Sequence, residues 1–239
     1  MKHISYIAAI AATTLIAAPA SAALLEMDGF TATLETADIV STSMGLTDRV
    51  GASGFRMIDV NDEIDELEQE FVAWCVDIEH TLIGVGDTHE YEVTSTPFSN
   101  STGLTAAAQM RLTALFNTSY DSVDITDGDE AAAWQLAVWE AAFETDSLMS
   151  LTSGDFTATS AGSVGMANSM LAAAASAISS SSVGDKYSLV YLESDGDFGR
   201  DFSQNLVTAV VAPVPLPAAG FLLLGGLAGF AALKRRKTS

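Results

Sequence analysis

The sequence predicts an α+β fold, in which a β-rich domain carries a helical insertion with a glutamine motif. On both sides of the chain's middle part lie segments in which apolar and polar residues partly alternate and β-branched residues are frequent. This pattern is typical of strands. Between them, apolar residues recur at three- and four-residue spacing, as in helices that pack on a core. We expect one folded domain over residues 23–212, preceded by a signal peptide over 1–22 and followed by a C-terminal apolar helix within 213–239.

The strand pattern appears six times. The densest segment, 71–78, is almost wholly apolar and contains Trp74 and Cys75, which predicts a buried strand. The segment 90–96 is expected to lie beside it. For the acidic stretch 61–70, a solvated turn or short helix is favoured over a cation site. The remaining predicted strands cover 29–40, 50–60, 186–192 and 202–211.

Three segments predict helices, over 104–116, over 131–143 and over part of 165–182, whose end is of low complexity. The second has the clearest pattern, because Leu136, Trp139 and Phe143 fall on one face. Asp127 or Asp129 can cap its start by accepting hydrogen bonds from the free amides of the first turn. We therefore expect this amphipathic helix to pack on the β-rich part of the domain.

The N-terminus has the pattern of a secretory signal peptide. Lys2 and His3 give a basic start, 7–18 is almost unbroken apolar sequence, and Ala20-Ser21-Ala22 is the small-x-small site that signal peptidase cleaves. The apolar stretch is short for a membrane span. We expect export, with a mature chain that begins near Ala23.

The C-terminus combines a proline motif, a short apolar segment and a basic tail. The motif is Val214-Pro215-Leu216-Pro217-Ala218, the apolar segment covers 219–233, and Lys234-Arg235-Arg236-Lys237 comes next. This order resembles the VPLPA-type, PEP-CTERM-like sorting domains of bacterial surface proteins. The resemblance implies recognition by an exosortase-like membrane protease, transient anchoring in the membrane, and a final location at the cell surface or outer envelope. A plain C-terminal anchor is the alternative.

Charge and cysteine content limit the function of the body. Five basic residues stand against all 31 acidic ones between the two ends, which leaves a formal charge of −26 and excludes nucleic acid as a partner. Cys75 is the sole cysteine, so it forms no intramolecular disulfide. An exported single thiol is inert and buried, paired between chains, or used in chemistry.

Two short segments suggest that the Cys75 thiol is used in chemistry. Trp74-Cys75-Val76-Asp77 lies on the predicted buried strand, and Trp134-Gln135-Leu136-Ala137-Val138-Trp139 lies on the second predicted helix. Together they resemble the paired motifs of the thioester domains of bacterial surface adhesins. The resemblance implies that Cys75 and Gln135 form an internal thioester, in a pocket to which Trp74, Ala137 and Trp139 contribute. Trp74 departs from the tyrosine or phenylalanine that is more usual in that family.

The chemistry suits these residue types. A thiolate that attacks the glutamine carbonyl releases ammonia and leaves an activated acyl group, which an amine or hydroxyl of a partner could then take. Such a protein acts once as a covalent hook, so we expect neither an enzyme nor a cofactor. No base is assigned: structural roles are favoured for His80 and His89.

Two alternatives remain open from the sequence. Cys75 is equally consistent with an ordinary core residue and Gln135 with a satisfied buried amide. The protein would then be a non-reactive acidic surface or matrix protein that organises cations and extracellular polysaccharide. A metal site is not expected, because the acidic runs lack EF-hand spacing and are explained as caps and turns. Those runs comprise Asp124, Asp127, Asp129 and Glu130, and Asp195 with Asp197.

Overall fold

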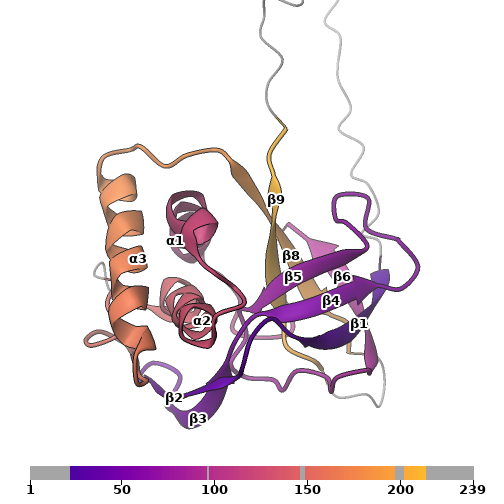
Figure 1. Cartoon of the computed structure of the whole chain (residues 1–239), viewed down its shortest axis with the longest axis horizontal. Coiled ribbons are helices and arrows are strands. Elements are labelled where there is room, and N and C mark those ends of the chain that lie inside the picture. Colours follow the sequence, from indigo (N-terminus) through magenta and orange to yellow (C-terminus); the bar gives the residue numbers. More distant parts are fainter. Residues whose placement is uncertain (1–21, 96, 146–148, 197–201, 214–239) are drawn as a thin grey trace, which may run out of the picture.

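The computed structural model describes residues 22–95, 97–145, 149–196 and 202–213. Within them, a six-stranded barrel stands beside a group of three helices, and a small second sheet lies along the helices (Figure 1). The signal peptide and the Val214–Ala218 motif with its apolar helix lie outside the described residues. None of the described helices has the combined length and apolarity needed to cross a bilayer.

The barrel is closed and antiparallel, with the strand order β1-β4-β5-β9-β8-β6. Its interior is filled by buried side chains such as Leu25, Met27, Met57 and Tyr91, which alternate with exposed residues along the strands as a half-buried sheet requires. The first and last strands both belong to it, and the barrel closes by pairing of β1 with β6. The strands are β1 Ala22–Phe30, β4 Phe55–Asp59, β5 Glu70–Cys75, β6 Thr88–Thr94, β8 Tyr187–Ser194 and β9 Leu206–Val211.

The second sheet has the order β3-β2-β7 and is also antiparallel. Its centre is β2, Glu35–Ser41, which pairs with β3, Leu46–Ala52, and with the short β7, Phe156–Thr159. Ala37 and Ile39 of β2 are buried, because this face packs against the second helix.

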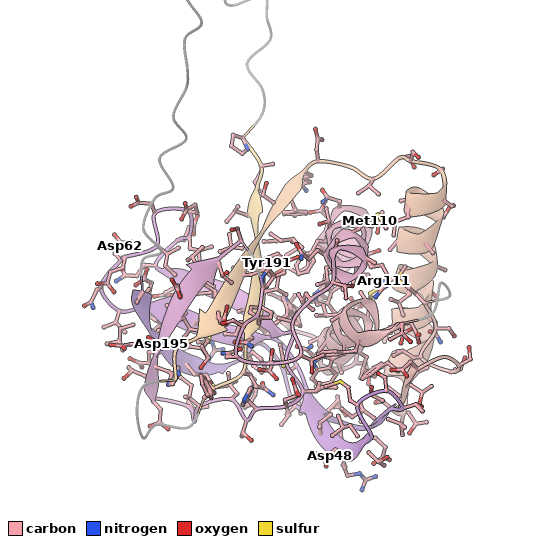
Figure 2. All side chains as sticks on the ribbon, turned by 180° about the vertical axis from the view of Figure 1, so that it is seen from behind. Asp48, Asp62, Met110, Arg111, Tyr191 and Asp195 are labelled. Carbon is pink, nitrogen blue, oxygen red and sulfur yellow. The ribbon has the colours of Figure 1, made fainter. Side chains whose placement is uncertain are left out.

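The helices form the other half of the core. α1 is Ala106–Ser119, capped by Thr105, whose side chain accepts from the Ala108 N–H. α2 is Gly128–Phe143, and α3 is Ser163–Ser179. α2 lies between α1, α3 and both sheets, and every residue from 131 to 142 is buried. Figure 2 shows side chains filling the space between the helices and the barrel, with the exposed Asp48 and Asp62 on the periphery.

Most predicted elements are present, with four corrections. The predicted strand 29–40 is divided between the end of β1 and β2, and most of β1, residues 22–28, was not predicted as a strand. The predicted strand 50–60 is interrupted between β3 and β4. Gly54 lies at the second break, where an added Cβ would stand 2.8 Å from the Trp74 ring. The strand 90–96 is not the neighbour of 71–78: β6 pairs with β1 and β8, whereas β5 pairs with β4 and β9. α2 is buried all round and is not amphipathic.

Other expectations agree with the structure wholly or in part, and the strand predicted over 202–211 begins only at Leu206. The stretch 61–70 is a turn region, in which Ile64 alone is fully buried. Asp127 is the cap of α2, since its Oδ1 accepts from the Glu130 N–H at 3.1 Å. The strand predicted over 71–78 exists but ends at Cys75, because the chain leaves the ladder at Asp77.

Candidate functional site

Cys75 is the last residue of β5 and lies where one neighbouring strand stops. β4 pairs with β5 only up to Phe55 opposite Ala73. On the other edge β9 continues, and the Val76 N–H donates to the Asn205 carbonyl at 3.0 Å. Successive residues of a strand direct their N–H and C=O groups to opposite edges, so those of Cys75 point to the edge that β4 leaves open. Both groups are buried and need partners.

Gln135 occupies this open edge from α2. Its Oε1 accepts from the Cys75 N–H at 2.9 Å, and its Nε2 donates to the Cys75 carbonyl at 2.8 Å. The carboxamide thus takes the place that another peptide group of β4 would fill. Gln135 is 0% exposed, and each peptide group left without a partner here would cost roughly 1–3 kcal/mol. This pair of bonds joins the helical half of the domain to the barrel.

The Cys75 thiol is directed toward the backbone two residues further on. Its S–H donates to the Asp77 carbonyl at 2.7 Å, and the Asp77 N–H donates to Sγ at 3.3 Å. Burial raises the pKa of the thiol to about 12, although the contacts with Asp77 and the indole of Trp139 oppose this shift. Trp139 Nε1 has no partner with full hydrogen-bond geometry among the described residues, so its N–H acts on the sulfur mainly as a nearby dipole.

The aromatic residues around the cysteine occupy two different sides. Trp139 lies one helical turn after Gln135 and therefore on the same face of α2. Trp74 points away from Cys75, as neighbouring strand residues do, and packs against Trp134 with ring centroids 6.1 Å apart. Ala137 is fully buried in α2 but does not share the face of Gln135, since residues two apart diverge on a helix. Of the three residues expected to contribute to the thioester pocket, Trp139 is therefore the one that lies on the same helix face as Gln135.

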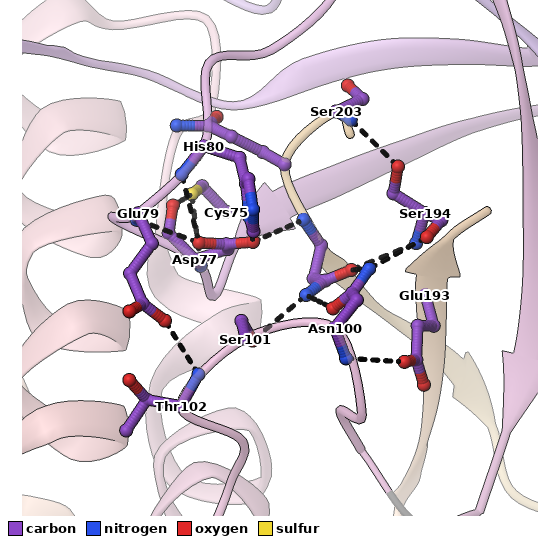
Figure 3. A network of polar contacts seen from close by, with 12 residues as sticks. Cys75, Asp77, Glu79, His80, Asn100, Ser101, Thr102, Glu193, Ser194 and Ser203 are labelled. Atoms are coloured by element: carbon purple, nitrogen blue, oxygen red, sulfur yellow. Dashed lines mark hydrogen bonds and ion pairs between the residues drawn. The ribbon is translucent and has the colours of Figure 1, made fainter. Parts of the chain in front are cut away.

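Asp77 is the centre of a buried polar network that the sequence did not reveal (Figure 3). Its Oδ1 accepts from the N–H groups of Glu79 and His80 at 2.8 and 3.2 Å. Its Oδ2 lies 2.7 Å from His80 Nδ1 and accepts from the Asn205 N–H at 3.3 Å. The sequence signal for this network was Asp77, an acidic residue that directly follows an apolar strand. A carboxylate buried there must be compensated by such contacts.

The network continues through Asn205 to the loop that precedes α1. The side-chain Nδ2 of Asn205 donates to Asn100 Oδ1 at 2.6 Å and to Ser101 Oγ at 3.1 Å. Glu193 of β8 accepts from the N–H groups of Ser99 and Asn100 at 2.6 and 3.1 Å. These contacts hold the segment after Cys75, the loop and the β8–β9 pair together, so the backbone around the cysteine is fixed from several directions.

A cleft of about 530 Å³ opens next to this site. Ile78 and Leu82 form part of its apolar wall, and Trp139, His80 and Glu79 also line it. Cys75 and Gln135 are not among its lining residues, and Trp139 is only 2% exposed. The indole therefore separates the cleft from the buried thiol and carboxamide.

The other candidate residues have structural roles. His89 is buried, and its Nε2 lies 2.8 Å from Ser194 Oγ. Asp124 accepts from the N–H and the hydroxyl of Thr126, which lowers the pKa of this carboxyl. Within the described ranges, no group of three or more histidine, cysteine, aspartate or glutamate side chains is arranged to hold a metal ion. Asp197 lies outside the described residues.

The arrangement fits acyl chemistry between Cys75 and Gln135. The hydrogen bond from the Cys75 N–H is directed at Oε1, the atom that would gain negative charge if a thiolate added to the carbonyl carbon. The backbone of the same residue that carries the thiol holds the carboxamide, which removes the entropy of bringing two groups together. Attack would require the thiol to leave its hydrogen bond to the Asp77 carbonyl.

Comparisons with known proteins give little further guidance. No protein-family model and no curated protein matches this chain. One solved structure that resembles it is the N-terminal domain of the Streptococcus pyogenes pilus tip adhesin Cpa, with a TM-score of 0.39 and 13% identity, over 75% of this chain and 95% of that one. A similarity this weak does not bear on the chemistry of the Cys75–Gln135 pair.

Proposed function

We propose that this protein is an exported surface protein that attaches covalently to a partner through an internal Cys75–Gln135 thioester. The observation that carries the proposal is the double hydrogen bond between the Gln135 carboxamide and the Cys75 backbone. These bonds join the two residues that the sequence motifs single out, although they lie 60 positions apart in the chain.

The surroundings of the pair support this chemistry. Both residues are 0% exposed, and exclusion of water protects a thioester from hydrolysis. Trp139 covers the pair on the side of the cleft. The proton-donating N–H at Oε1 and the fixed backbone would favour attack by the thiol, and ammonia would leave as Nε2 departs. An amine or hydroxyl on the partner would later take the acyl group from Cys75.

The ends of the chain supply the rest of the proposal. Signal peptidase would release the mature body, and an exosortase-like membrane protease would act at Val214–Ala218 and transfer the protein to the cell surface. The membrane would hold the chain transiently through the apolar segment 219–233. The partner carries a surface amine or hydroxyl, on a protein or an extracellular polysaccharide.

The second candidate is a non-reactive acidic surface protein. It is favoured by one observation: both polar atoms of the Gln135 carboxamide already have partners, as in any well-packed core. Its body charge of −26 would then organise cations and polysaccharide.

Thiol alkylation separates the two candidates. A thioester protein resists alkylation when native and when freshly unfolded, until methylamine opens the bond, frees Cys75 and leaves an adduct on Gln135. An ordinary buried thiol ignores methylamine and is alkylated as soon as the protein unfolds. Cys75→Ala and Gln135→Ala should each abolish the adduct. Alkylation of unfolded wild-type protein without any prior amine would contradict the hook.

A further inference from the structure

The cleft beside Trp139 contains a histidine that is held in one orientation by a buried carboxylate. His80 Nδ1 lies 2.7 Å from Asp77 Oδ2, and Asp77 is fully buried. Because a carboxylate only accepts, the proton of a neutral imidazole lies on Nδ1 and the lone pair on Nε2. No hydrogen bond to Nε2 is found within the described residues. A neutral His80 therefore presents a free proton acceptor.

Asp77 also connects this histidine with the cysteine. Its carbonyl accepts from the Cys75 S–H at 2.7 Å, while its carboxylate binds the imidazole of His80. Figure 3 shows Cys75, Asp77 and His80 grouped together at the end of β5. Thiol and imidazole thus lie on either side of one residue: His80 lines the cleft, whereas Trp139 separates the Cys75 thiol from it.

The position of His80 suits a group that exchanges protons with solvent or a ligand. Its side chain is 22% exposed, whereas that of Asp77 is 0% exposed. The ring rests against Phe202, with centroids 5.5 Å apart.

We propose that the cleft lined by Ile78, Leu82 and Trp139 is the route by which the acyl acceptor reaches the thioester, and that His80 is the base that takes its proton. This inference rests on the proposed thioester. The nitrogen of a primary amine adds to the Gln135 carbonyl carbon, and its proton passes to His80 Nε2. The C–S bond then breaks, and the imidazolium returns the proton to the sulfur. The products are an N-substituted amide on Gln135 and a free Cys75 thiol, without any change of oxidation state.

The environment of the thiol explains why a proton donor is needed at the end. Burial raises the pKa of the Cys75 thiol to about 12, so a bare thiolate is a poor leaving group inside this fold. The charged side chains that bind His80 or share the cleft with it, among the described residues, are those of Asp77, Glu79 and Asp48.

The test measures the rate of methylamine uptake at Gln135 against pH, for purified wild-type protein and for His80→Asn. Asparagine keeps an N–H for Asp77 but has no basic nitrogen. After correction for the free-base fraction of methylamine, the wild-type rate should rise with one titration as the imidazole loses its proton. The variant should react on the order of 100-fold more slowly, the usual size of a general-base effect, and without that titration.

A matched control is Glu79→Gln, which removes a charge from the same cleft and can still accept from the Thr102 N–H, as Glu79 does at 2.6 Å. It should keep the titration. Equal rates and profiles for wild-type and His80→Asn would overturn the role of His80, and so would loss of the titration in Glu79→Gln. A His80→Asn protein that never forms the thioester would also overturn it, by placing His80 in bond formation. Absence of the thioester from wild-type protein would instead contradict the proposed function itself.

Discussion

The carboxamide of Gln135 and the backbone of Cys75 form two hydrogen bonds, of 2.9 and 2.8 Å, across the junction between helix α2 and the barrel. The bonds replace a missing piece of strand β4 and leave none of the four polar atoms unpaired. The contact that completes the sheet also brings together Cys75 and Gln135, the two residues proposed to react. The Gln135 side chain therefore serves both the structure and the proposed chemistry, whereas the Cys75 side chain serves only the chemistry, and variants can separate the two roles.

The first prediction concerns stability. In the absence of a thioester, Gln135→Ala should lower the free energy of unfolding by about 3–5 kcal/mol, because it opens a cavity and orphans two buried peptide groups. Cys75→Ala removes one small side chain and leaves both bonds intact, so about 1–2 kcal/mol is expected. Denaturant unfolding of Cys75→Ala and of the double variant measures the Gln135 contribution without any thioester. Equal stabilities of these two proteins would show that the clamp contributes nothing.

The second prediction concerns pH and the C-terminal part of α2. Glu140 is 0% exposed, and burial raises its pKa to about 8, despite a hydrogen bond from the Ser150 N–H. Arg111, labelled in Figure 2, binds the nearby carbonyls of Ala141 and Glu144 rather than this carboxyl. We therefore expect Glu140 to be protonated in the folded protein at neutral pH.

The sign of the effect follows from this raised pKa. The folded state holds the Glu140 proton up to about pH 8, while the unfolded chain releases it near 4.5, so stability is lost as pH rises through this window. Glu140→Gln should be as stable as wild type at pH 4 and more stable by on the order of 2 kcal/mol at pH 9. The exposed Glu90→Gln serves as control. A Glu140→Gln effect that is the same at pH 4 and pH 9 would disprove the assignment.

The third prediction concerns protection of the thioester by Trp139. Trp139→Leu should open the wall between the cleft and Cys75 and admit water, so the fraction of Gln135 converted to glutamate by hydrolysis should rise. Trp134→Leu is the matched control, because Trp134 is equally buried but packs against Trp74 and Tyr120. Peptide mass spectrometry of both folded variants measures the conversion. The idea fails if the two variants hydrolyse alike.

The fourth prediction concerns sorting. Deletion of 214–239 removes the proline motif, the apolar segment and the basic tail, but none of the described strands or helices. We expect the truncated protein to fold and to appear in the medium, whereas the full chain stays with the cells. Replacement of Pro215 and Pro217 by alanine tests the motif separately from the apolar segment. Retention of the truncated protein at the surface would show that another part of the chain anchors it.

The sequence predicts the helices and strands of this fold better than it predicts which strands pair with one another. The helical spacing over 131–143 and the cap at Asp127 are local properties, and the helix and its cap are both observed, although its predicted amphipathic face is not. The barrel order is not local: β6 joins β1 and β8, and β9 joins β5, which no short-range pattern specifies. β7 has only four residues, too few for an alternation pattern to be recognised.

The candidate site shows the same division. The motifs identify Cys75 and Gln135, and the structure brings them together. They do not identify Asp77 or the orientation of His80, because these depend on Asn205 and the loop before α1, far along the chain. The thioester itself remains a prediction, since a covalent bond between two side chains is a chemical outcome and must be measured.

The most direct measurement is the mass of tryptic peptides from native protein. Trypsin cleaves after Arg56, Arg111 and Lys186, so Cys75 lies in the peptide 57–111 and Gln135 in the peptide 112–186. With a thioester, these two peptides should appear joined, at their summed mass less one ammonia, and should separate when methylamine is added. Two separate peptides of unmodified mass, before any amine is added, would contradict the thioester and favour the inert acidic surface protein instead.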